Sequence, residues 1–499
     1  MAPGSSGDAP PAGDGAGEDD AIEDPESSPA IPAAALASRA APSVLGDRSA
    51  SHTPRTEREI WSLAWPVILS QALASIVSLI DMAMVGRLGR DAVAAVTYTT
   101  QYLNLAQSVL FAVGMASVAL MARAIGASEP ARARSAFGAS FVVCGAVAGL
   151  FTAIVLLAPH GLLELLEAPP HVIAVGAGYF QLTLGSVLLL AVSITVESGF
   201  RACRNTRVAM LIALAVTVAK TVLNALLIFG VLGFPRLELV GAGLATLLSQ
   251  VLAVLLFVWA ARRGPHADVL RLGAADLAHA REQLRPMATV ALPAVGERVV
   301  LNVAIMTYVT VLGHYGTAQV AAYGIGTRLM SFSWIPGTGF SVAAATLVGQ
   351  ALGAADPAGA ERAGWRAARF ALFVSIVLGL AFGVAREPIA HLFTSDAGVV
   401  EALGPFMLLL ALAQPPMGVH FTLGGALRGA GDTWTPLIAA TLGNWGFRVP
   451  IAFIASAGMQ LGIVWVWAAL IADHFMRAVW LTASFRRGRW KRKVGASVR

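Results

Sequence analysis

Charged residues are scarce in this sequence of 499 amino acids: only 13% are Asp, Glu, Lys or Arg, whereas 57% are apolar. The mean hydropathy of +0.70 agrees with that balance. A soluble enzyme needs a charged surface, so this composition excludes one. Apolar runs recur along most of the chain, and each is long enough to cross the ~30 Å hydrocarbon core of a bilayer as a helix. They are too long and continuous for the alternating strands of a membrane barrel, so we predict an all-α polytopic membrane protein.

Cysteine is nearly absent as well. Cys144 falls in an apolar run and Cys203 in a polar break, and two such residues make neither a disulfide framework nor a metal cluster. No glycine-rich nucleotide-binding loop and no zinc-protease motif occurs. We therefore expect no catalytic residues, no metal and no cofactor. The pI near 9.7 does not indicate a nucleic-acid partner, because the basic residues lie in short loops and at the C-terminal end, where membrane topology explains them.

The apolar runs predict twelve membrane-spanning helices, at 60–85, 92–122, 133–158, 171–200, 206–232, 240–261, 286–312, 318–349, 360–385, 398–427, 433–457 and 461–485. Residues 1–52 contain no apolar run and are rich in Ala, Pro, Gly, Ser, Asp and Glu, which predicts a disordered acidic tail. A polar linker at 262–285 divides the helices into a first half, 58–261, and a second half, 286–485, and a basic tail follows at 486–499.

Lysine and arginine are distributed unevenly between the loops. With both termini in the cytoplasm, the cytoplasmic segments from Arg55 onward hold 24 Lys and Arg residues, and the outer loops hold four. Cytoplasmic loops of membrane proteins are enriched in these residues. The bias predicts a multi-pass protein of the cell inner (plasma) membrane with both termini in the cytoplasm. We expect a monomer surrounded by the lipid bilayer.

One offset relates the two halves of the sequence. Moving the chain by 227 residues superposes Pro66 on Pro293 and Arg201 on Arg428, and it aligns further pairs of glycines, alanines and threonines from the first span to the fifth. A single offset without a gap indicates an internal duplication. Because each half has six spans, both enter the membrane in the same direction. We expect two six-helix lobes related by a pseudo-twofold axis along the membrane normal, with a cleft between them that suits alternating access.

Several motifs, in order and spacing, resemble one known transporter family. They are Pro66 followed by Asp81-Met82-Ala83-Met84-Val85-Gly86-Arg87-Leu88-Gly89, then Asn224-Ala225-Leu226-Leu227-Ile228-Phe229-Gly230, Leu347-Val348-Gly349-Gln350 with Gly353-Ala354, Leu427-Arg428-Gly429-Ala430-Gly431-Asp432-Thr433, Arg448-Val449-Pro450 and Gly488-Arg489-Trp490. From residue 58 to residue 490 the chain resembles the multidrug and toxic compound extrusion (MATE) transporters. The resemblance implies twelve helices in two lobes and export of cationic or amphipathic compounds, driven by inward movement of H⁺ or Na⁺.

Asp81 lies near the end of the first predicted span. A charge there is costly unless it has a partner or water, so the residue is a functional candidate; the alternative is an Asp that has simply reached the outer headgroup layer. The resemblance implies that Asp81 is the first-helix acid that the family uses to bind a cation or proton. It also implies a kink at Pro66 that responds to Asp81, and the repeat mate Pro293 indicates a structural role shared by both lobes.

Lys220 is one of three lysines in the chain and the only one inside a predicted span. It precedes Asn224 by four residues, so both side chains share a helix face. Proton-coupled archaeal relatives resemble this region but have Asn and Asp at these two positions, so their carboxylate pair does not transfer to this chain. Our hypothesis is an ion pair between Lys220 and Asp81 that protonation or substrate breaks. The ammonium would repel Na⁺, which favours H⁺ coupling; the alternative is a lysine that reaches the membrane interface.

Further residues are candidates for the substrate cleft. Tyr98 and Trp334 offer aromatic rings to flat lipophilic cations, although aromatic residues in spans more often serve packing. Glu297 either pairs with Arg298 beside it or binds a substrate cation, and we favour the structural interpretation. The remaining candidates are Gln101, Asn444 and Arg448.

These observations together predict a secondary active antiporter that exports cationic or amphipathic small molecules by alternating access. H⁺ influx is favoured over Na⁺ influx as the driving force. A flippase for lipid-linked precursors is the alternative within the same superfamily, and Lys220 and Arg448 give it some support because such a cavity is more cationic. A membrane-embedded enzyme is the third class, and the missing catalytic constellation counts against it.

Overall fold

The computed structural model describes residues 53–494 apart from 313–314, 316 and 394–396. The tail predicted at 1–52 lies outside these residues. Every regular element in the described ranges is helical. The elements are α1 (Thr53–Gly86), α2 (Arg90–Gly126), α3 (Pro130–Leu157), α4 (Pro159–Leu165), α5 (Pro170–Gly185), α6 (Val187–Ala202), α7 (Thr206–Phe229), η2 (Val231–Gly233), α8 (Glu238–Arg263), α9 (Ala267–Leu270), α10 (Ala274–Leu312), α11 (Thr317–Gly353), α12 (Pro357–Val384), α13 (Arg386–Phe393), α14 (Ala397–Gly429), α15 (Trp434–Thr441), η4 (Leu442–Arg448), α16 (Val449–Phe453), η5 (Ile454–Gly458), α17 (Ile463–Arg487) and η6 (Arg489–Val494).

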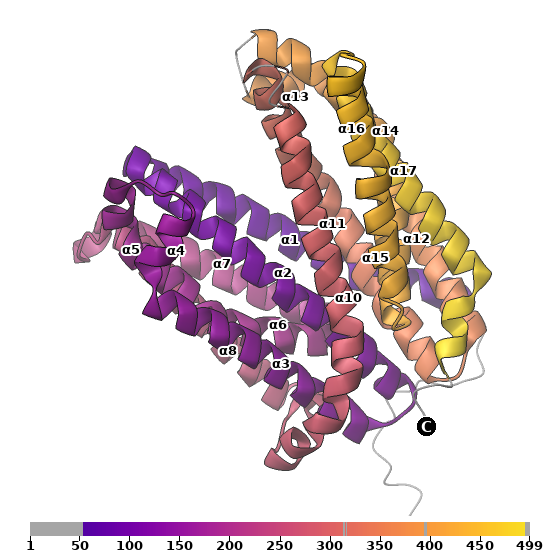
Figure 1. Cartoon of the computed structure of the whole chain (residues 1–499). Helices are drawn as coiled ribbons and strands as arrows, with labels where there is room; N and C mark the ends of the chain where they lie inside the picture. Colours follow the sequence, from indigo (N-terminus) through magenta and orange to yellow (C-terminus); the bar gives the residue numbers. More distant parts are fainter. Residues whose placement is uncertain (1–52, 313–314, 316, 394–396, 495–499) are drawn as a thin grey trace, which may run out of the picture. The chain divides into compact units, whose positions relative to one another are not determined.

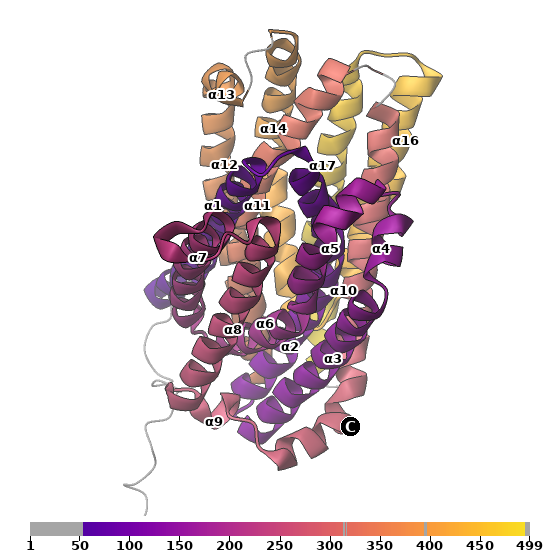
Figure 2. The same ribbon diagram turned by 90° about the vertical axis from the view of Figure 1, so that its left-hand side faces the viewer.

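Twelve helical segments among the described residues are long and apolar enough to cross a membrane, which confirms the predicted spans and makes the chain an integral membrane protein. The helices of the first half (indigo to magenta) lie together, and so do α12 to α17 of the second half (orange to yellow), whereas α10 (rose) also runs alongside α2 and α3 (Figures 1 and 2). Two spans are less regular than expected. The fourth is broken at Ser186, between α5 and α6. The eleventh passes through two π-helical segments, η4 and η5, on either side of Pro450, which lacks the N–H that an ordinary α-helical turn needs.

Turns at equivalent places in the two halves have the same backbone conformation. Ser128 after α2 and Ala355 after α11 both have positive φ, at 62° and 55°, and they lie 227 residues apart. Arg204 after α6 and Gly431 after α14, at the same offset, have φ of 60° and 70°. A left-handed residue reverses the chain after a helix, and a proline then begins both α3 and α12. The duplication therefore extends to local backbone geometry.

Helix α1 belongs to both halves of the molecule. Its first turns bury Ile60, Leu63 and Ala64 in a core formed by α11, α12 and α14 of the second half. Its last turns bury Val85 in a core formed by α2, α5, α7 and α8 of the first half. Pro66 is buried within this contact with the second half, since Ile68 after it still packs against the same core. The helix thus passes from one half to the other within its own length.

Helix α10 repeats this arrangement in the opposite direction. Its early residues Met287, Val290 and Ala291 pack in a core of the first half, with α2, α3 and α6. Its late residues Tyr308 and Leu312 pack in a core of the second half. The three early residues are the repeat mates, at an offset of 227, of the three that α1 buries in the second half. Each half therefore contributes the first turns of one of its helices, α1 or α10, to a core of the other half.

The two halves approach each other most closely where α2 and α11 end. A Cβ added at Gly126 would lie 2.0 Å from the carbonyl oxygen of Gln350, and one added at Gly353 would lie 2.0 Å from that of Arg123. No side chain fits at such a distance, so this crossing requires glycine in both helices. Gly126 and Gly353 are repeat mates, and so are Arg123 and Gln350.

Hydrogen bonds also connect the two halves near the ends of α2 and α11. The Nε2 atom of Gln350 donates to the carbonyl oxygen of Ala202 at 2.7 Å, which ties α11 to the end of α6. In the opposite direction, the guanidinium of Arg123 on α2 donates to the carbonyl oxygen of Ala430 after α14. Both bonds join a side chain of one half to the backbone of the other. They hold the two halves together at this end in the conformation described here.

Candidate functional site

The charged centre of the first half joins α1 to α7. Oδ2 of Asp81 accepts a hydrogen bond of 2.5 Å from Nζ of Lys220, and Oδ1 accepts one of 2.6 Å from Nδ2 of Asn224. Lys220 and Asn224 are one turn apart on α7, so the helix presents both donors to a single carboxylate. The structure thus brings together the three residues predicted to bind a cation or proton, and it contains the ion pair of our hypothesis.

The neighbouring helices enclose this centre largely but not completely. The side chains of Asp81 and Lys220 are 21% and 26% exposed, whereas Asn224 is 2% exposed. Tyr179 of α5 lies close enough for its phenol to interact electrostatically with the carboxylate. Tyr179 was not among the predicted site residues, because no pattern in the sequence links it to Asp81. Since Lys220 is held by an acid of a neighbouring helix, the alternative of a lysine extended to the membrane interface is not supported.

In the second half, Glu297 of α10 pairs with Arg428 of α14. The Nη2 atom of Arg428 lies 2.6 and 2.8 Å from the two carboxylate oxygens, and each side chain is less than one fifth exposed. The ion pair is therefore not the one expected with Arg298. Neighbouring residues of a helix point in different directions, so Glu297 and Arg298 are poorly placed to pair. The pair fastens α10 to α14, in line with a structural role for Glu297.

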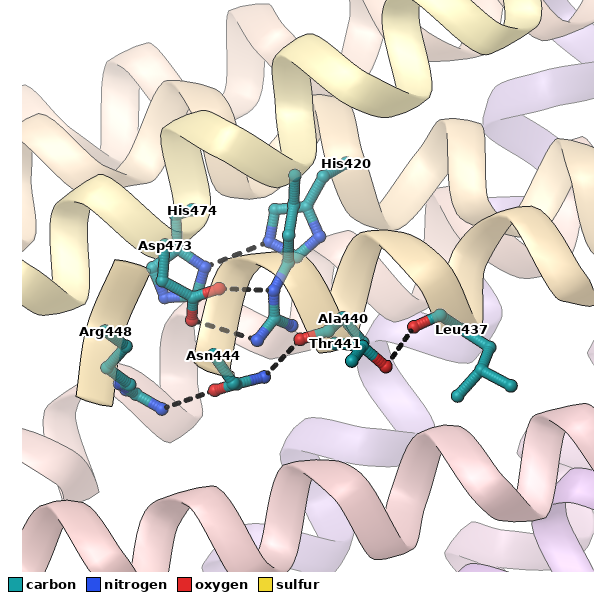
Figure 3. Close-up of polar contacts among 9 residues, drawn as sticks. His420, Leu437, Ala440, Thr441, Asn444, Arg448, Asp473 and His474 are labelled. Atoms are coloured by element: carbon teal, nitrogen blue, oxygen red, sulfur yellow. Dashed lines mark hydrogen bonds and ion pairs between the residues drawn. The ribbon is translucent and has the colours of Figure 1, made fainter. Parts of the chain in front are cut away.

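A second polar cluster, whose residues were not among the predicted site residues, is buried in the second half (Figure 3). Asp473 and Arg477, one turn apart on α17, form an ion pair through two contacts of 2.5 and 2.9 Å. Beside it, Nε2 of His420 on α14 lies 3.1 Å from Nδ1 of His474 on α17, and the two rings are stacked. All four side chains are less than one tenth exposed. The spacing of Asp473 and Arg477 inside a predicted span was the available signal.

Asn444 and Arg448 border this cluster on η4. Nδ2 of Asn444 donates to the carbonyl oxygen of Ala440 at 2.8 Å, and Nη1 of Arg448 donates to Oδ1 of Asn444 at 3.4 Å. The Arg448 guanidinium also lies over the ring of Tyr308 on α10, 5.1 Å from its centroid. Asn444 is 0% exposed and Arg448 2%. Both were predicted to line an open cleft, and both instead lie inside the second half.

The other residues predicted for the cleft lie apart from one another. Tyr98 of α2 is partly buried against cores of the first half, and Gln101, one turn further along α2, is exposed. Trp334 of α11 packs in the second half against Phe421, with ring centroids 6.3 Å apart. A role of these three side chains in substrate binding stays a prediction. Among the predicted site residues, Asp81, Lys220 and Asn224 thus meet in the first half, and Asn444 and Arg448 meet in the second.

Comparison with known proteins fits this architecture. The MatE family profile matches residues 66–226 and again 293–454, and the two matches begin 227 residues apart. The chain belongs to the MatE family. The match begins in each half at the repeated proline, which is the same duplication that the residue pattern indicates. As a member of the MATE transporters, the protein is a membrane transporter and not an enzyme.

Relatives of this MATE chain cover between 70% and 88% of its length. The "Probable multidrug resistance protein NorM" of Thermotoga maritima is 26% identical over 451 residues, which cover 88% of this chain and 94% of the relative. The protein of the same description from Bradyrhizobium diazoefficiens is 32% identical over 450 residues, 86% of this chain and 92% of the relative. A "FAD transporter" of Shewanella oneidensis is 27% identical over 356 residues, 70% of this chain and 77% of the relative.

Solved structures share the fold. A mutant of the Vibrio cholerae MATE transporter VcmN superposes with a TM-score of 0.80 at 21% identity, covering 87% of this chain and 97% of that one. A MOP superfamily transporter from Pyrococcus furiosus, described as having a binding pocket of reverse polarity, superposes with a TM-score of 0.79 at 19% identity, covering 89% of this chain and 97% of that one. The expected all-α fold with twelve membrane helices is confirmed.

Proposed function

We propose that this MATE-family chain is a secondary active antiporter that exports cationic or amphipathic small molecules by alternating access, coupled to H⁺ influx. The observation that carries the proposal is the carboxylate of Asp81, which is shared by Lys220 and Asn224. A proton and an ammonium compete for the same carboxylate charge, so binding of one weakens the hold of the other. Asp81 is not fully enclosed by the described residues, and the proposal requires that protons reach it from one side of the membrane.

Protonation changes the hydrogen bonding of the whole centre. A neutral Asp81 loses its charge attraction to Lys220, and its new hydroxyl becomes a donor. The carbonyl oxygen of Asn224 is buried and has no hydrogen-bond partner among the described residues, so the amide can accept that new proton after a rotation. Proton uptake therefore exchanges an ion pair between α1 and α7 for a neutral hydrogen bond.

The position of α1 connects this exchange to the rest of the molecule. Asp81 holds the late turns of α1 to the first half, while Ile60 and Leu63 anchor its early turns in the second half. Pro66 lies between these points and removes one backbone hydrogen bond, which lets the two parts of the helix tilt separately. Loosening the contact with α7 thus changes how α1 spans the two halves, which suits a two-state transporter.

The charge around Asp81 favours H⁺ over Na⁺ as the coupling ion. The Lys220 ammonium lies 2.5 Å from the carboxylate oxygen, and it would repel a sodium ion at the same oxygen. The names of multidrug relatives support amphipathic organic substrates. The flippase alternative rested on the positive charges of Lys220 and Arg448. Because Asp81 neutralises the charge of Lys220, only Arg448 still supports it. We also propose the inner (plasma) membrane with cytoplasmic termini, in line with the distribution of Lys and Arg, and we propose that the chain acts as a monomer.

Transport in proteoliposomes tests the proposal. The purified chain and its Asp81→Asn variant are reconstituted, and uptake of the lipophilic cation rhodamine 123 is followed under an imposed pH gradient or an imposed Na⁺ gradient. We expect the wild type to respond to the pH gradient and the variant to lose that response. A wild type driven by Na⁺ alone would replace H⁺ as the coupling ion, and an Asp81→Asn protein that still follows the pH gradient would remove Asp81 from the mechanism.

A further inference from the structure

Arg448 is a buried cation without an acidic partner. Its side chain is 2% exposed, and among the described residues its contacts are a 3.4 Å hydrogen bond to Oδ1 of Asn444 and the face of Tyr308. The Nε atom has no hydrogen-bond partner at all in this part of the chain. A guanidinium removed from water is costly unless it is paired with an anion and its N–H groups are bonded. Arg448 thus has donors to spare and a charge to compensate.

The nearby acids are already engaged. Both carboxylate oxygens of Asp473 accept bonds from Arg477, and both oxygens of Glu297 lie against Arg428. Each of these ion pairs is neutral by itself. The positive charge of Arg448 is therefore left over in the buried cluster.

His474 adds a second unused polar atom beside this charge. Its Nδ1 atom is engaged with His420, while its Nε2 atom is buried without a partner in the described part of the chain. When His420 donates to Nδ1, the neutral His474 ring carries its proton on Nε2 and offers an N–H donor there. The ring lies close enough to Arg448 for the two groups to interact electrostatically. The Nε atom of Arg448 on η4 and the Nε2 atom of His474 on α17 thus both lie in this buried cluster without a hydrogen-bond partner among the described residues.

The backbone around Arg448 is irregular as well. The residue ends the seven-residue π-helical segment η4, and π-helical turns are rare features that recur at functional sites. A Cβ at Gly443 in the same segment would lie 2.1 Å from Oδ1 of Asp473, so η4 packs directly against the ion pair of α17. Figure 3 shows Arg448, Asn444, Asp473 and His474 facing one another across η4 and α17. Irregular helix at membrane depth is expected where it surrounds a polar site.

We propose that the cluster around Arg448 is a binding site for a carboxylate or phosphate group. An anion there would accept charge-assisted hydrogen bonds from the guanidinium and a further one from Nε2–H of His474, and it would neutralise the uncompensated charge. The group comes either from an amphipathic substrate that carries it or from a free anion. The first source rests on the proposed export function, whereas binding itself does not.

Thermal unfolding of the purified full chain tests binding. Midpoints are compared in sodium chloride, sodium acetate and sodium phosphate at one pH and one ionic strength, because a ligand that binds only the folded state raises the midpoint. We expect acetate or phosphate to raise the wild-type midpoint by a few degrees over chloride, and Arg448→Gln to abolish that rise. The Asn444→Asp variant is the matched control: its own carboxylate takes the place of the anion, so its midpoint rises in chloride and no longer responds to acetate. A wild type without an anion-dependent rise, or a rise that persists in both variants, overturns the site.

Transport distinguishes the two sources of the anion. Rhodamine 110 carries a free carboxylate, and rhodamine 123 is its methyl ester, so the pair differs in that charge. If the substrate supplies the group, Arg448→Gln lowers the transport of rhodamine 110 about ten- to a hundred-fold, the worth of a charged hydrogen bond, and spares rhodamine 123. If a free anion binds instead, the wild type still shows the anion-dependent rise in its thermal midpoint, and Arg448→Gln changes the transport of both dyes equally. A wild type that moves neither dye refutes the export function while the thermal result still decides the site.

Discussion

Pro66 of α1 and Pro293 of α10 occupy equivalent points on two helices that cross between the halves of the molecule. Each proline is buried at the turns that its helix contributes to the core of the opposite half. The residues that follow it return to the helix's own half, where Val85 and Leu312 are buried. The two crossings are related by the 227-residue offset, so any relative movement of the halves bends both helices near these prolines.

Replacing either crossing proline is therefore expected to slow transport while the protein still folds. In Pro66→Ala and Pro293→Ala the missing backbone hydrogen bond can form, which stiffens the helix. We expect about ten-fold slower transport of rhodamine 123, equivalent to about 1.4 kcal/mol in the barrier, with an unchanged or higher thermal midpoint. Pro405→Ala in α14 is the control and should transport normally. Equal rates in all three variants would show that the crossings do not bend during transport.

The ion pair between Asp81 and Lys220 should appear as coupling in a double-mutant cycle. Asp81→Asn and Lys220→Met each leave one partly buried charge unpaired, whereas the double variant leaves none. We expect the two single changes to destabilise the protein by more, when added together, than the double change does, with a coupling of about 1–3 kcal/mol. Thermal or chemical unfolding measures stability, and dye efflux measures function. Additive effects on both would mean that the contact has no energetic role.

The glycine crossing between α2 and α11 should tolerate no side chain. Gly126→Ala and Gly353→Ala place a methyl group against a backbone carbonyl that cannot move aside, and such overpacking costs about 1–3 kcal/mol. We expect a lower thermal midpoint and faster maleimide labelling of Cys203, which directly follows Ala202 at this contact. Gly145→Ala in α3 is the matched control, because a Cβ there meets nothing within 4 Å. Labelling that stays slow in both crossing variants would contradict the close approach.

Breaking the ion pair between Glu297 and Arg428 should lower the unfolding free energy more than removing the charge of Arg298 does. Glu297→Gln leaves a largely buried guanidinium without an acid, and we expect a loss of about 3 kcal/mol in unfolding free energy. Arg298→Gln serves as control, because Arg298 is exposed and is not the ion-pair partner of Glu297. Denaturant unfolding of both variants gives the comparison. A larger loss in Arg298→Gln would restore the local pair that the sequence predicted.

Cys203 should react slowly with thiol reagents. Burial, and next the negative charge of Asp268, raise the pKa of its thiol to about 12, so the thiolate fraction near pH 8 is on the order of a thousand-fold smaller than for an ordinary thiol. In a Cys144→Ala background, labelling should accelerate about ten-fold for each pH unit, and unfolded protein should label quickly at every pH. The raised pKa also means that the neutral thiol stabilises the fold below its unfolded pKa and that this contribution is lost as the pH rises toward 12. Rapid labelling of the folded protein at pH 7 would refute the shift.

The sequence by itself determined the class of the protein and its repeat. Transfer of a helix into a bilayer depends on the summed hydropathy of about twenty neighbouring residues, which is a local quantity, so the twelve spans could be counted from the residues alone. The 227-residue offset was equally visible, because Pro66 and Pro293 are matched without knowledge of the fold. Asp81 and Lys220 stood out because charges inside apolar runs are costly and rare.

Only the tertiary structure decided which of these groups meet. The partner of Glu297 is Arg428, 131 residues away, and no periodicity within α10 could select it over Arg298. The buried stack of His420 on His474 and the leftover charge of Arg448 likewise depend on how α14, η4 and α17 pack. Hydropathy places a helix in the membrane but leaves its rotation and neighbours open. Those follow from contacts between side chains that the chain brings together only when the halves fold and exchange α1 and α10.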